Sequence, residues 1–273
     1  MPEAMADRLR FTILGCGSSP GVPRINGDWG ACDPANPRNA RLRCAAMVER
    51  ISADGGVTRV VIDTGPDFRA QMIAAKVDRL DAAIYTHPHA DHIHGIDDLR
   101  GYALVQRRRI DVYADQDTMQ RLDQAFGYCF ATPPGSNYPP ILEPHLFAHD
   151  GPVTIEGEGG PLAFVPLPQV HGDILSVGFR IGGLGYCPDV SAFPERTAAR
   201  LSGLDVLVID ALQYKPHPSH FSLGEALDWI GRLKPARAIL THMHTPLDYD
   251  TVMRETPAHV EPAYDGMTVE LDL

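Results

Sequence analysis

Six consecutive residues, His87-Pro88-His89-Ala90-Asp91-His92, constrain this chain more than any other part of its sequence. They place three imidazoles and one carboxylate directly after an apolar segment, residues 82–85, that is typical of a buried β-strand. Imidazole and carboxylate groups bind borderline divalent metals such as zinc and manganese. Histidines also occur together by chance on solvated loops, but four such groups after one strand indicate a site for two metal ions.

Length and charge limit the class of protein. At 273 residues, with 44% hydrophobic and 22% charged residues, the chain has an ordinary globular composition, and we expect residues 1–273 to form a single domain. The formal net charge of −11 disfavours a surface that holds long nucleic acid through many phosphate contacts. A small anionic substrate held by metal ions remains compatible with this charge.

The cysteines and the N-terminus indicate a cellular compartment. Five cysteines form an odd set without a Cys-x-x-Cys pair, which is not typical of a disulfide-linked secreted domain. The first ten residues lack the apolar stretch of a signal peptide, and no segment approaches about 18 consecutive apolar residues. We therefore expect a cytoplasmic protein with reduced thiols and no membrane partner.

Strands and helices are expected to alternate along the chain. The capping-box residues Ser222 and Glu225 begin a helix over residues 222–233, and another helix is expected over residues 115–126. Gly182-Gly183 predicts a tight hairpin, whereas the proline-rich segment 132–144 predicts an irregular surface excursion near the site or at a partner surface. Apolar runs predict strands at residues 11–14, 60–62, 110–114, 162–165, 175–181, 184–186, 206–209 and 238–240, and a final strand after the turn at 264–267.

The His-x-His-x-Asp-His pattern and the order of the later elements resemble the metallo-β-lactamase superfamily over essentially the whole chain. This resemblance implies an α/β fold, a four-layer αββα sandwich with metals at one edge of two packed sheets. It also implies three further ligands, each just after a predicted strand: His171, Asp189 and His242. Taken singly, histidines and aspartates at strand ends are usually capped or solvated polar residues, and for His171 alone the two interpretations are evenly balanced.

The implied ligand set divides between two metal ions. His87, His89 and His171 would hold one ion, and Asp91, His92 and His242 the other, with Asp189 shared. Two divalent cations about 3.5 to 4 Å apart would lower the pKa of a bridging water and neutralise charge on a phosphoryl oxygen. Hydrolysis is the expected reaction, with Asp91 counted as catalytic as well as ligating, and phosphodiesters, thioesters and lactams are all possible substrates.

A second histidine-rich loop, residues 215–222, discriminates among these substrates. His220 resembles the non-ligand histidine of the phosphodiesterase branch, which includes ribonuclease Z and the phosphoribosyl cyclic phosphodiesterase of phosphonate degradation. The resemblance implies that His220 contacts the phosphate and, when protonated, assists the leaving oxygen. Helix capping or local hydrogen bonding is the alternative for His220, and it is the favoured interpretation for His217.

The turn over residues 15–21 contains a Gly-x-Gly pattern after a strand. Pro20 occupies the place of a third glycine, and Pro23 breaks the following segment, so a dinucleotide-binding fold is disfavoured. Similar turns in the phosphodiesterase branch line the active-site edge, and we therefore expect Ser18 to contact substrate. Asp63, in another family turn, is expected to orient site loops rather than bind metal.

Two differences from the family limit the metal sites and the substrates that we expect. Cys32 has no neighbouring cysteines, so the additional structural zinc of some relatives is not expected, and the role of His244 is left open. The basic, glycine-rich arm with which ribonuclease Z grips transfer RNA has no counterpart in this sequence.

The sequence therefore predicts a metal-dependent phosphodiesterase that uses two divalent metal ions, zinc or manganese, on a small phosphodiester such as a cyclic phosphate or a nucleotide-like molecule. A homodimer is compatible with the family. One alternative is a thioester hydrolase of the glyoxalase II kind, although the residues after His242 predict a strand rather than the expected C-terminal helices. The other is a non-catalytic binding or cofactor-biosynthesis protein, which the complete ligand set disfavours.

Overall fold

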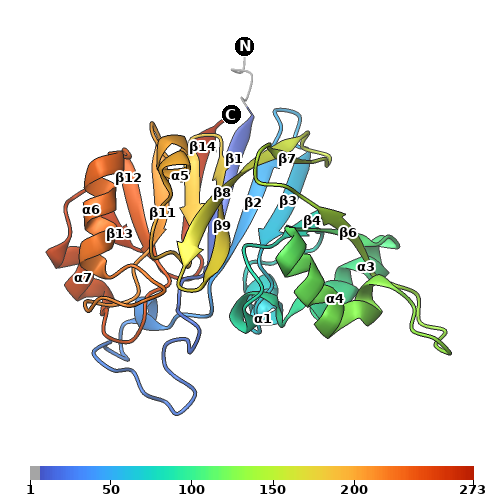
Figure 1. Ribbon diagram of the computed structural model, residues 1–273, viewed down its shortest axis with the longest axis horizontal. Helices are drawn as coiled ribbons and strands as arrows, with labels where there is room; N and C mark the ends of the chain where they lie inside the picture. Colours follow the sequence, from blue (N-terminus) through green and yellow to red (C-terminus); the bar gives the residue numbers. More distant parts are fainter. Residues whose placement is uncertain (1–6) are drawn as a thin grey trace.

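The computed structural model describes residues 7–273, in which two β-sheets pack face to face between layers of helices (Figure 1). The first sheet has the order β14 (Thr268–Asp272), β1 (Arg8–Gly15), β2 (Ala45–Ile51), β3 (Val57–Ile62), β4 (Ala82–Ile84), β5 (Ile110–Ala114) and β6 (Leu142–Leu146). The second has the order β13 (Val260–Pro262), β12 (Arg237–Thr241), β11 (Val206–Asp210), β10 (Leu184–Cys187), β9 (Ile174–Ile181), β8 (Leu162–His171) and β7 (Val153–Ile155). The four-layer sandwich expected from the sequence is confirmed.

Helices cover the outer faces of both sheets (Figure 1). On the first sheet these are α1 (Phe68–Ala74), α3 (Arg100–Gln106) and α4 (Gln116–Phe130), and on the second α5 (Glu195–Arg200), α6 (Leu223–Leu233) and α7 (Tyr249–Glu255). The single-turn helix α2 (Ala90–Ile93) and two 3-10 turns, Pro37–Asn39 and Ile96–Leu99, lie in loops. Within residues 7–273, no helix combines the length and apolar character that a membrane crossing requires.

Alternating side chains explain why the sheets form layers. Along β2, Ala46 and Val48 pack into the core between the sheets, whereas Ala45 and Met47 face the helices. Strand β11 is buried at every position, as expected for a parallel strand covered on both faces. The apolar residues thus fix each strand, and with it the loop that follows.

Parallel pairing of the strands brings the loops that contain the predicted site residues to one edge of the sheets. Strands β3 and β4 are parallel neighbours in the first sheet, and β10, β11 and β12 are parallel neighbours in the second. Parallel strands end at the same edge of a sheet, so their carboxyl-terminal loops meet there. Asp63 and His87 follow the first pair, whereas Asp189 and His242 follow β10 and β12, so all four lie where the two sheets end together.

Several elements differ in extent from those expected. Strand β8 continues to His171 although the apolar run predicted residues 162–165 only, because β7 pairs with its beginning and leaves Pro166 and Pro168 at an open edge. The proline-rich segment 132–144 is irregular only to residue 141, since its last residues begin the edge strand β6. Helix α4 extends to Phe130, and the capping box of Ser222 and Glu225 is confirmed.

Candidate metal centre

The seven predicted ligand side chains converge at the shared edge of the sheets. Nδ1 of His89 lies 3.2 Å from Nε2 of His171, and Oδ1 of Asp189 lies 3.9 Å from Nε2 of both His87 and His171. Ligand atoms of His87, His89 and His171 all lie within 4.8 Å of one another. These three side chains and one oxygen of Asp189 therefore surround the first predicted ion position.

The other oxygen of Asp189 faces the second predicted group. Its Oδ2 lies 3.2 Å from Nε2 of His92 and 3.2 Å from Nδ1 of His242. Oδ2 of Asp91, in turn, lies 3.5 Å from Nε2 of His92. The carboxylate of Asp189 thus stands between the two groups, as the sequence predicted for a shared ligand.

The site has unsatisfied polar atoms that fit metal ions. Among residues 7–273, Nε2 of His87, Nε2 of His92, Oδ2 of Asp189 and both ring nitrogens of His242 are buried without a hydrogen-bond partner. A buried polar atom without a partner is costly, so such a group of them indicates a missing charge or ligand. Imidazole nitrogens with carboxylate oxygens are a donor set suited to zinc or manganese, and the residues present therefore fit two such ions.

The pKa shifts of His87 and Asp189 favour the forms that bind metal, whereas at His92 and His242 the Asp189 carboxylate outweighs burial and raises the pKa of both imidazoles well above the ordinary value. Burial, reinforced by nearby His92, lowers the pKa of His87 well below its ordinary value. Burial opposes ionisation of Asp189, but His242 and His92 outweigh it and hold the pKa of that carboxyl well below its usual range. A neutral imidazole and an ionised carboxylate are the forms that coordinate a cation.

Residues outside the ligand set hold the ligands in orientation. Asp63 accepts hydrogen bonds from Nδ1 of His92 at 2.7 Å and from the backbone and hydroxyl of Thr86 at 2.9 and 2.7 Å. His171 donates from Nδ1 to the carbonyl oxygen of Ser219 at 2.6 Å, which leaves Nε2 facing His89. The predicted role of Asp63 in orienting the site agrees with these contacts, and they define one for Thr86 as well.

The backbone is strained where it presents these side chains. Asp63, Asp189 and His242 have φ angles of 66°, 49° and 57°, in the left-handed region that residues other than glycine rarely adopt. Such conformations persist where surrounding structure enforces them, and they are common at functional sites.

His220 lies beside the predicted ligands. Its ring centroid is 4.6 Å from those of both His171 and His242, and its Nδ1 lies 2.7 Å from Oδ2 of Asp210. Asp210 is fully buried at the end of β11, and burial raises the pKa of its carboxyl although His220 opposes the shift. Because Nδ1 is held by Asp210, Nε2 is the nitrogen of His220 that remains for another partner.

A cavity of about 230 Å³ opens beside this histidine. It is lined by Ser18, Ser19, Pro20, Leu212, Gln213, His217, His220, His242 and His244. Both predicted substrate-contacting residues, Ser18 and His220, therefore border the same space. His244 lies between Ser18 and Arg24, and burial together with Arg24 lowers its pKa to about 4.

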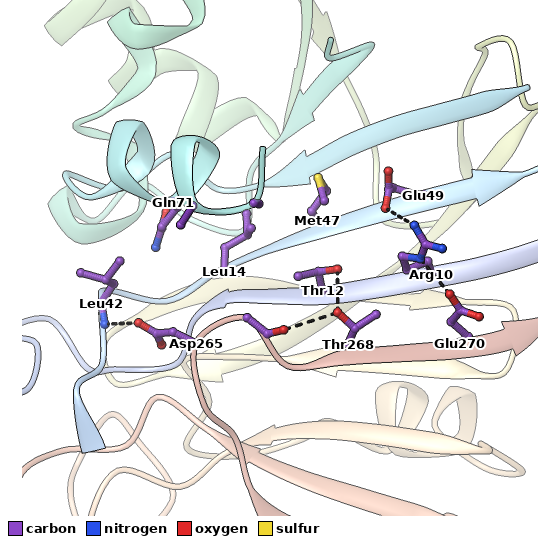
Figure 2. A pocket seen from close by; sticks show the side chains of 13 residues that line it. Arg10, Thr12, Leu14, Leu42, Met47, Glu49, Gln71, Asp265, Thr268 and Glu270 are labelled. Atoms are coloured by element: carbon purple, nitrogen blue, oxygen red, sulfur yellow. Dashed lines mark hydrogen bonds and ion pairs between the residues drawn. The ribbon is translucent and has the colours of Figure 1, made fainter. Parts of the chain in front are cut away.

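A larger cavity lies elsewhere and does not contain the predicted site. Figure 2 shows this groove of about 640 Å³ on the helix-covered face of the first sheet, beside α1. Its charged side chains are largely paired, as Arg10 contacts Glu49 at 3.7 Å and Glu270 at 2.8 Å, and Asp265 accepts from the backbone N–H of Leu42 at 2.7 Å. None of the predicted site residues lines it, so we place the functional site at the smaller cavity.

Sequence reasoning missed three side chains of this region. Asp210 orients His220, Arg24 contacts His244, and the thiol of Cys44 lies within 4.8 Å of ligand atoms of Asp189 and His242. No local motif marks them, although Asp210 follows a predicted strand just as Asp189 and His242 do.

Comparison with known proteins agrees with this fold. Residues 58–243 match the model of the family described as beta-lactamase superfamily domain. The crystal structure of a diphosphatase from the PhnP family is 35% identical, with a TM-score of 0.87 and coverage of 98% of this chain and 99% of that one.

Two curated relatives have other names. An octanoyltransferase from Porphyromonas gingivalis strain W83 is 32% identical over 97% of this chain, but the chain spans only 52% of that protein's length. The coenzyme PQQ synthesis protein B from Methylobacterium sp. strain 4-46 is 27% identical over 76% of this chain and 74% of that relative. The family match and the full-length similarity to the diphosphatase together establish that this chain belongs to the beta-lactamase superfamily and, within it, to the PhnP family.

Proposed function

We propose that this protein is a metal-dependent hydrolase, a phosphodiesterase that acts on a small phosphodiester such as a cyclic phosphate or a nucleotide-like molecule. The observation that carries the proposal is His220, which borders the cavity beside the predicted metal ligands while Asp210 occupies its Nδ1. A histidine in this place can serve a phosphoryl group through Nε2.

The ligand set supports a site for two divalent metal ions, zinc or manganese. His87, His89 and His171 would hold one ion, Asp91, His92 and His242 the other, and Asp189 would contact both. When bound, such a pair supplies Lewis-acid activation of water and neutralises charge that develops on phosphoryl oxygens.

His220 has the catalytic role in this proposal. Protonated, its Nε2–H donates a hydrogen bond to a phosphoryl oxygen or a proton to the leaving oxygen. Asp210 accepts the Nδ1–H hydrogen bond at 2.7 Å and so fixes the direction of the ring. Val190 donates its backbone N–H to the same carboxylate at 2.9 Å, which holds Asp210 in turn.

The cavity and the charge support a small substrate. About 230 Å³ accommodates a phosphate with a compact substituent, and a net charge of −11 does not favour long nucleic acid. A second candidate is a diphosphate, because the 35% identical PhnP-family structure is named a diphosphatase. Parallel assays with a cyclic phosphate and a nucleoside diphosphate compound separate the two candidates.

Substitution of His220 tests the proposal. With bis(p-nitrophenyl) phosphate as substrate, His220→Ala is expected to lower the rate by about 10² to 10⁴ while the metal content stays unchanged. His145→Ala is a matched control, because His145 also contacts an aspartate at 2.7 Å, in this case Asp111, but on the distant strand β6. A wild-type rate in His220→Ala contradicts the catalytic role, and loss of metal instead assigns His220 to metal binding.

A second variant tests the metal site itself. Asp189→Ala removes the carboxylate between the two ligand groups and is expected to abolish turnover. Retention of the wild-type rate by purified Asp189→Ala contradicts a mechanism that depends on two metals. A glutathione thioester assayed in parallel tests the thioester alternative. Absence of any turnover by the metal-loaded wild type favours the alternative of a non-catalytic binding or cofactor-biosynthesis protein.

A further inference from the structure

Ser18, His244 and Arg24 form a chain of hydrogen bonds that ends at the cavity beside His220. Oγ of Ser18 lies 2.8 Å from Nδ1 of His244, and Nε2 of the same ring lies 2.6 Å from a terminal nitrogen of Arg24. Ser18 and Arg24 belong to the loop between β1 and β2, whereas His244 follows β12. These hydrogen bonds therefore join two loops that are far apart in the sequence.

The direction of these hydrogen bonds follows from the chemistry of arginine. A guanidinium group is always charged in proteins and only donates hydrogen bonds, so Nε2 of His244 must be the acceptor. The ring proton of the neutral imidazole then lies on Nδ1, which donates to Oγ of Ser18. As a result, the hydroxyl hydrogen of Ser18 points away from His244.

The position of Ser18 leaves its hydroxyl hydrogen free to donate into the cavity. The residue is 2% exposed, and within residues 7–273 its hydroxyl has no hydrogen-bond partner other than His244. It nevertheless lines the cavity that His220 also lines. A buried hydroxyl whose donor is unused and that borders a cavity is ready to bind an acceptor there.

The backbone holds Ser18 in this place. Gly17 bridges to both Arg43 and Met243, and a Cβ on Gly17 would lie 2.9 Å from the carbonyl oxygens of Arg41 and Leu42. The N–H of Ser18 donates to the carbonyl oxygen of Met243 at 3.4 Å. Arg24 is held in turn by Asp28 at 3.1 Å.

We infer that Arg24 and His244 are positioning residues that fix the Ser18 hydroxyl as a hydrogen-bond donor to a phosphoryl oxygen of the substrate. This inference rests on the proposed function, because it names the oxygen-bearing group that His220 also serves. Neighbouring Ser19 donates to Oδ2 of Asp91 at 2.6 Å, so the turn that carries the Ser18 hydroxyl also contacts a predicted metal ligand. The turn thereby links substrate binding to the metal centre.

Kinetics of three variants test the inference against a purely structural role. Ser18→Ala is expected to raise KM for bis(p-nitrophenyl) phosphate about tenfold or more, with kcat nearly unchanged, since it removes a hydrogen bond to a charged group. Arg24→Met is expected to raise KM in the same direction, and Arg24→Lys, which keeps a cationic donor, is expected to restore it. Arg8→Gln is the control. The side chain of Arg8 is exposed to a similar extent as that of Arg24 and also forms an ion pair, with Glu270, but Arg8 lies at the opposite end of β1 from the Ser18 turn.

The double variant separates positioning from loop stability. If Arg24 acts through Ser18, Arg24→Met adds little to KM once Ser18→Ala is present. If Arg24 only stabilises the loop, the two effects on KM multiply, and that result overturns the inference. Equal thermal unfolding temperatures and equal zinc content in all variants keep the comparison valid.

Two further measurements stand independently of turnover. Nitrogen-15 NMR of the zinc-loaded protein should show His244 with its proton on Nδ1, and Arg24→Met should shift the population toward Nε2. Calorimetric titration with inorganic phosphate should show weaker binding to Ser18→Ala. A wild-type tautomer protonated on Nε2, or phosphate binding unaffected by Ser18→Ala, overturns the inference, whereas wild-type protein that hydrolyses no phosphodiester refutes only the proposed function.

Discussion

The carboxylate of Asp63 accepts a hydrogen bond from Nδ1 of His92 at 2.7 Å, and Nε2 on the opposite side of that ring lies 3.2 Å from Oδ2 of Asp189. Asp63 therefore selects which nitrogen of His92 is free for a cation. Carboxylates that contact ligating histidines in this way fix the ring and strengthen its basicity. The geometry of the predicted metal centre thus depends on residues that would not touch the metal.

Asp63→Asn is expected to weaken zinc binding by about 10- to 100-fold, because the amide cannot accept from both His92 and Thr86 as the carboxylate does. Competition with a chromophoric chelator measures this change. Asp111→Asn is the control, since Asp111 also contacts a histidine, His145, away from the site. Equal zinc affinity in Asp63→Asn and wild type would show that the contact does not support the metal.

Asp210→Asn is expected to lower kcat/KM by about tenfold or more while zinc content stays constant, because His220 loses the carboxylate that orients it. Steady-state kinetics with elemental analysis measures both quantities. In combination with His220→Ala, the Asp210 substitution should cause no further loss. A full additional loss in the double variant would mean that Asp210 acts by another route.

Gly65→Ala should disrupt the metal centre, since a Cβ at residue 65 would lie 2.1 Å from the carbonyl oxygen of Asp91. We expect a destabilisation of about 1 to 3 kcal/mol together with weaker zinc binding. A Cβ on Gly101, in α3, would meet no atom within 4 Å. Gly101→Ala should therefore be neutral or stabilise the protein by up to about 1 kcal/mol. Urea unfolding of the two variants compares them directly, and similar effects would contradict the steric argument.

The contribution of Asp265 to stability should fall as pH rises from about 4 to about 6. Burial raises the pKa of this carboxyl from 3.8 to about 6, although hydrogen bonds from Leu42 and Cys16 oppose the shift. Below pH 4 the group is protonated in both states, whereas above that pH the unfolded chain ionises first, which favours unfolding. The contribution amounts to about 1 to 3 kcal/mol by pH 7.

Urea unfolding of metal-free wild type and Asp265→Asn across this pH range measures that contribution. The difference in the free energy of unfolding between the two proteins should change with pH and level off above about pH 7. A difference that stays constant from pH 4 to pH 7 would show that Asp265 has an ordinary pKa.

Sequence patterns predicted the parts of the site whose spacing is local. His87, His89, Asp91 and His92 lie within six residues, and the capping box of α6 involves residues three apart. Partners from distant segments left no such pattern: the carbonyl oxygen of Ser219 that holds His171 lies 48 residues away, and Ser18 and His244 are 226 residues apart. Only packing of the two sheets brings them together.

Each predicted strand lies within or largely coincides with a strand of the structure, but the predictions missed β2 and the second half of β8 for a related reason. Strand β2 was not expected, because Glu49 and Arg50 interrupt its apolar pattern. Glu49 is nevertheless buried in the structure, where its carboxylate forms ion pairs with Arg59 and Arg10. The extension of β8 past Pro166 depends on how short its neighbour β7 is, which the residues of β8 do not reveal.

Anomalous X-ray diffraction from crystals of zinc-loaded protein decides whether two metal ions bind at the shared edge of the sheets. We expect two peaks on either side of the Asp189 carboxylate, one among His87, His89 and His171 and the other among Asp91, His92 and His242. Zinc-loaded crystals with no peak at this edge of the sheets, or with peaks only elsewhere, would contradict this expectation.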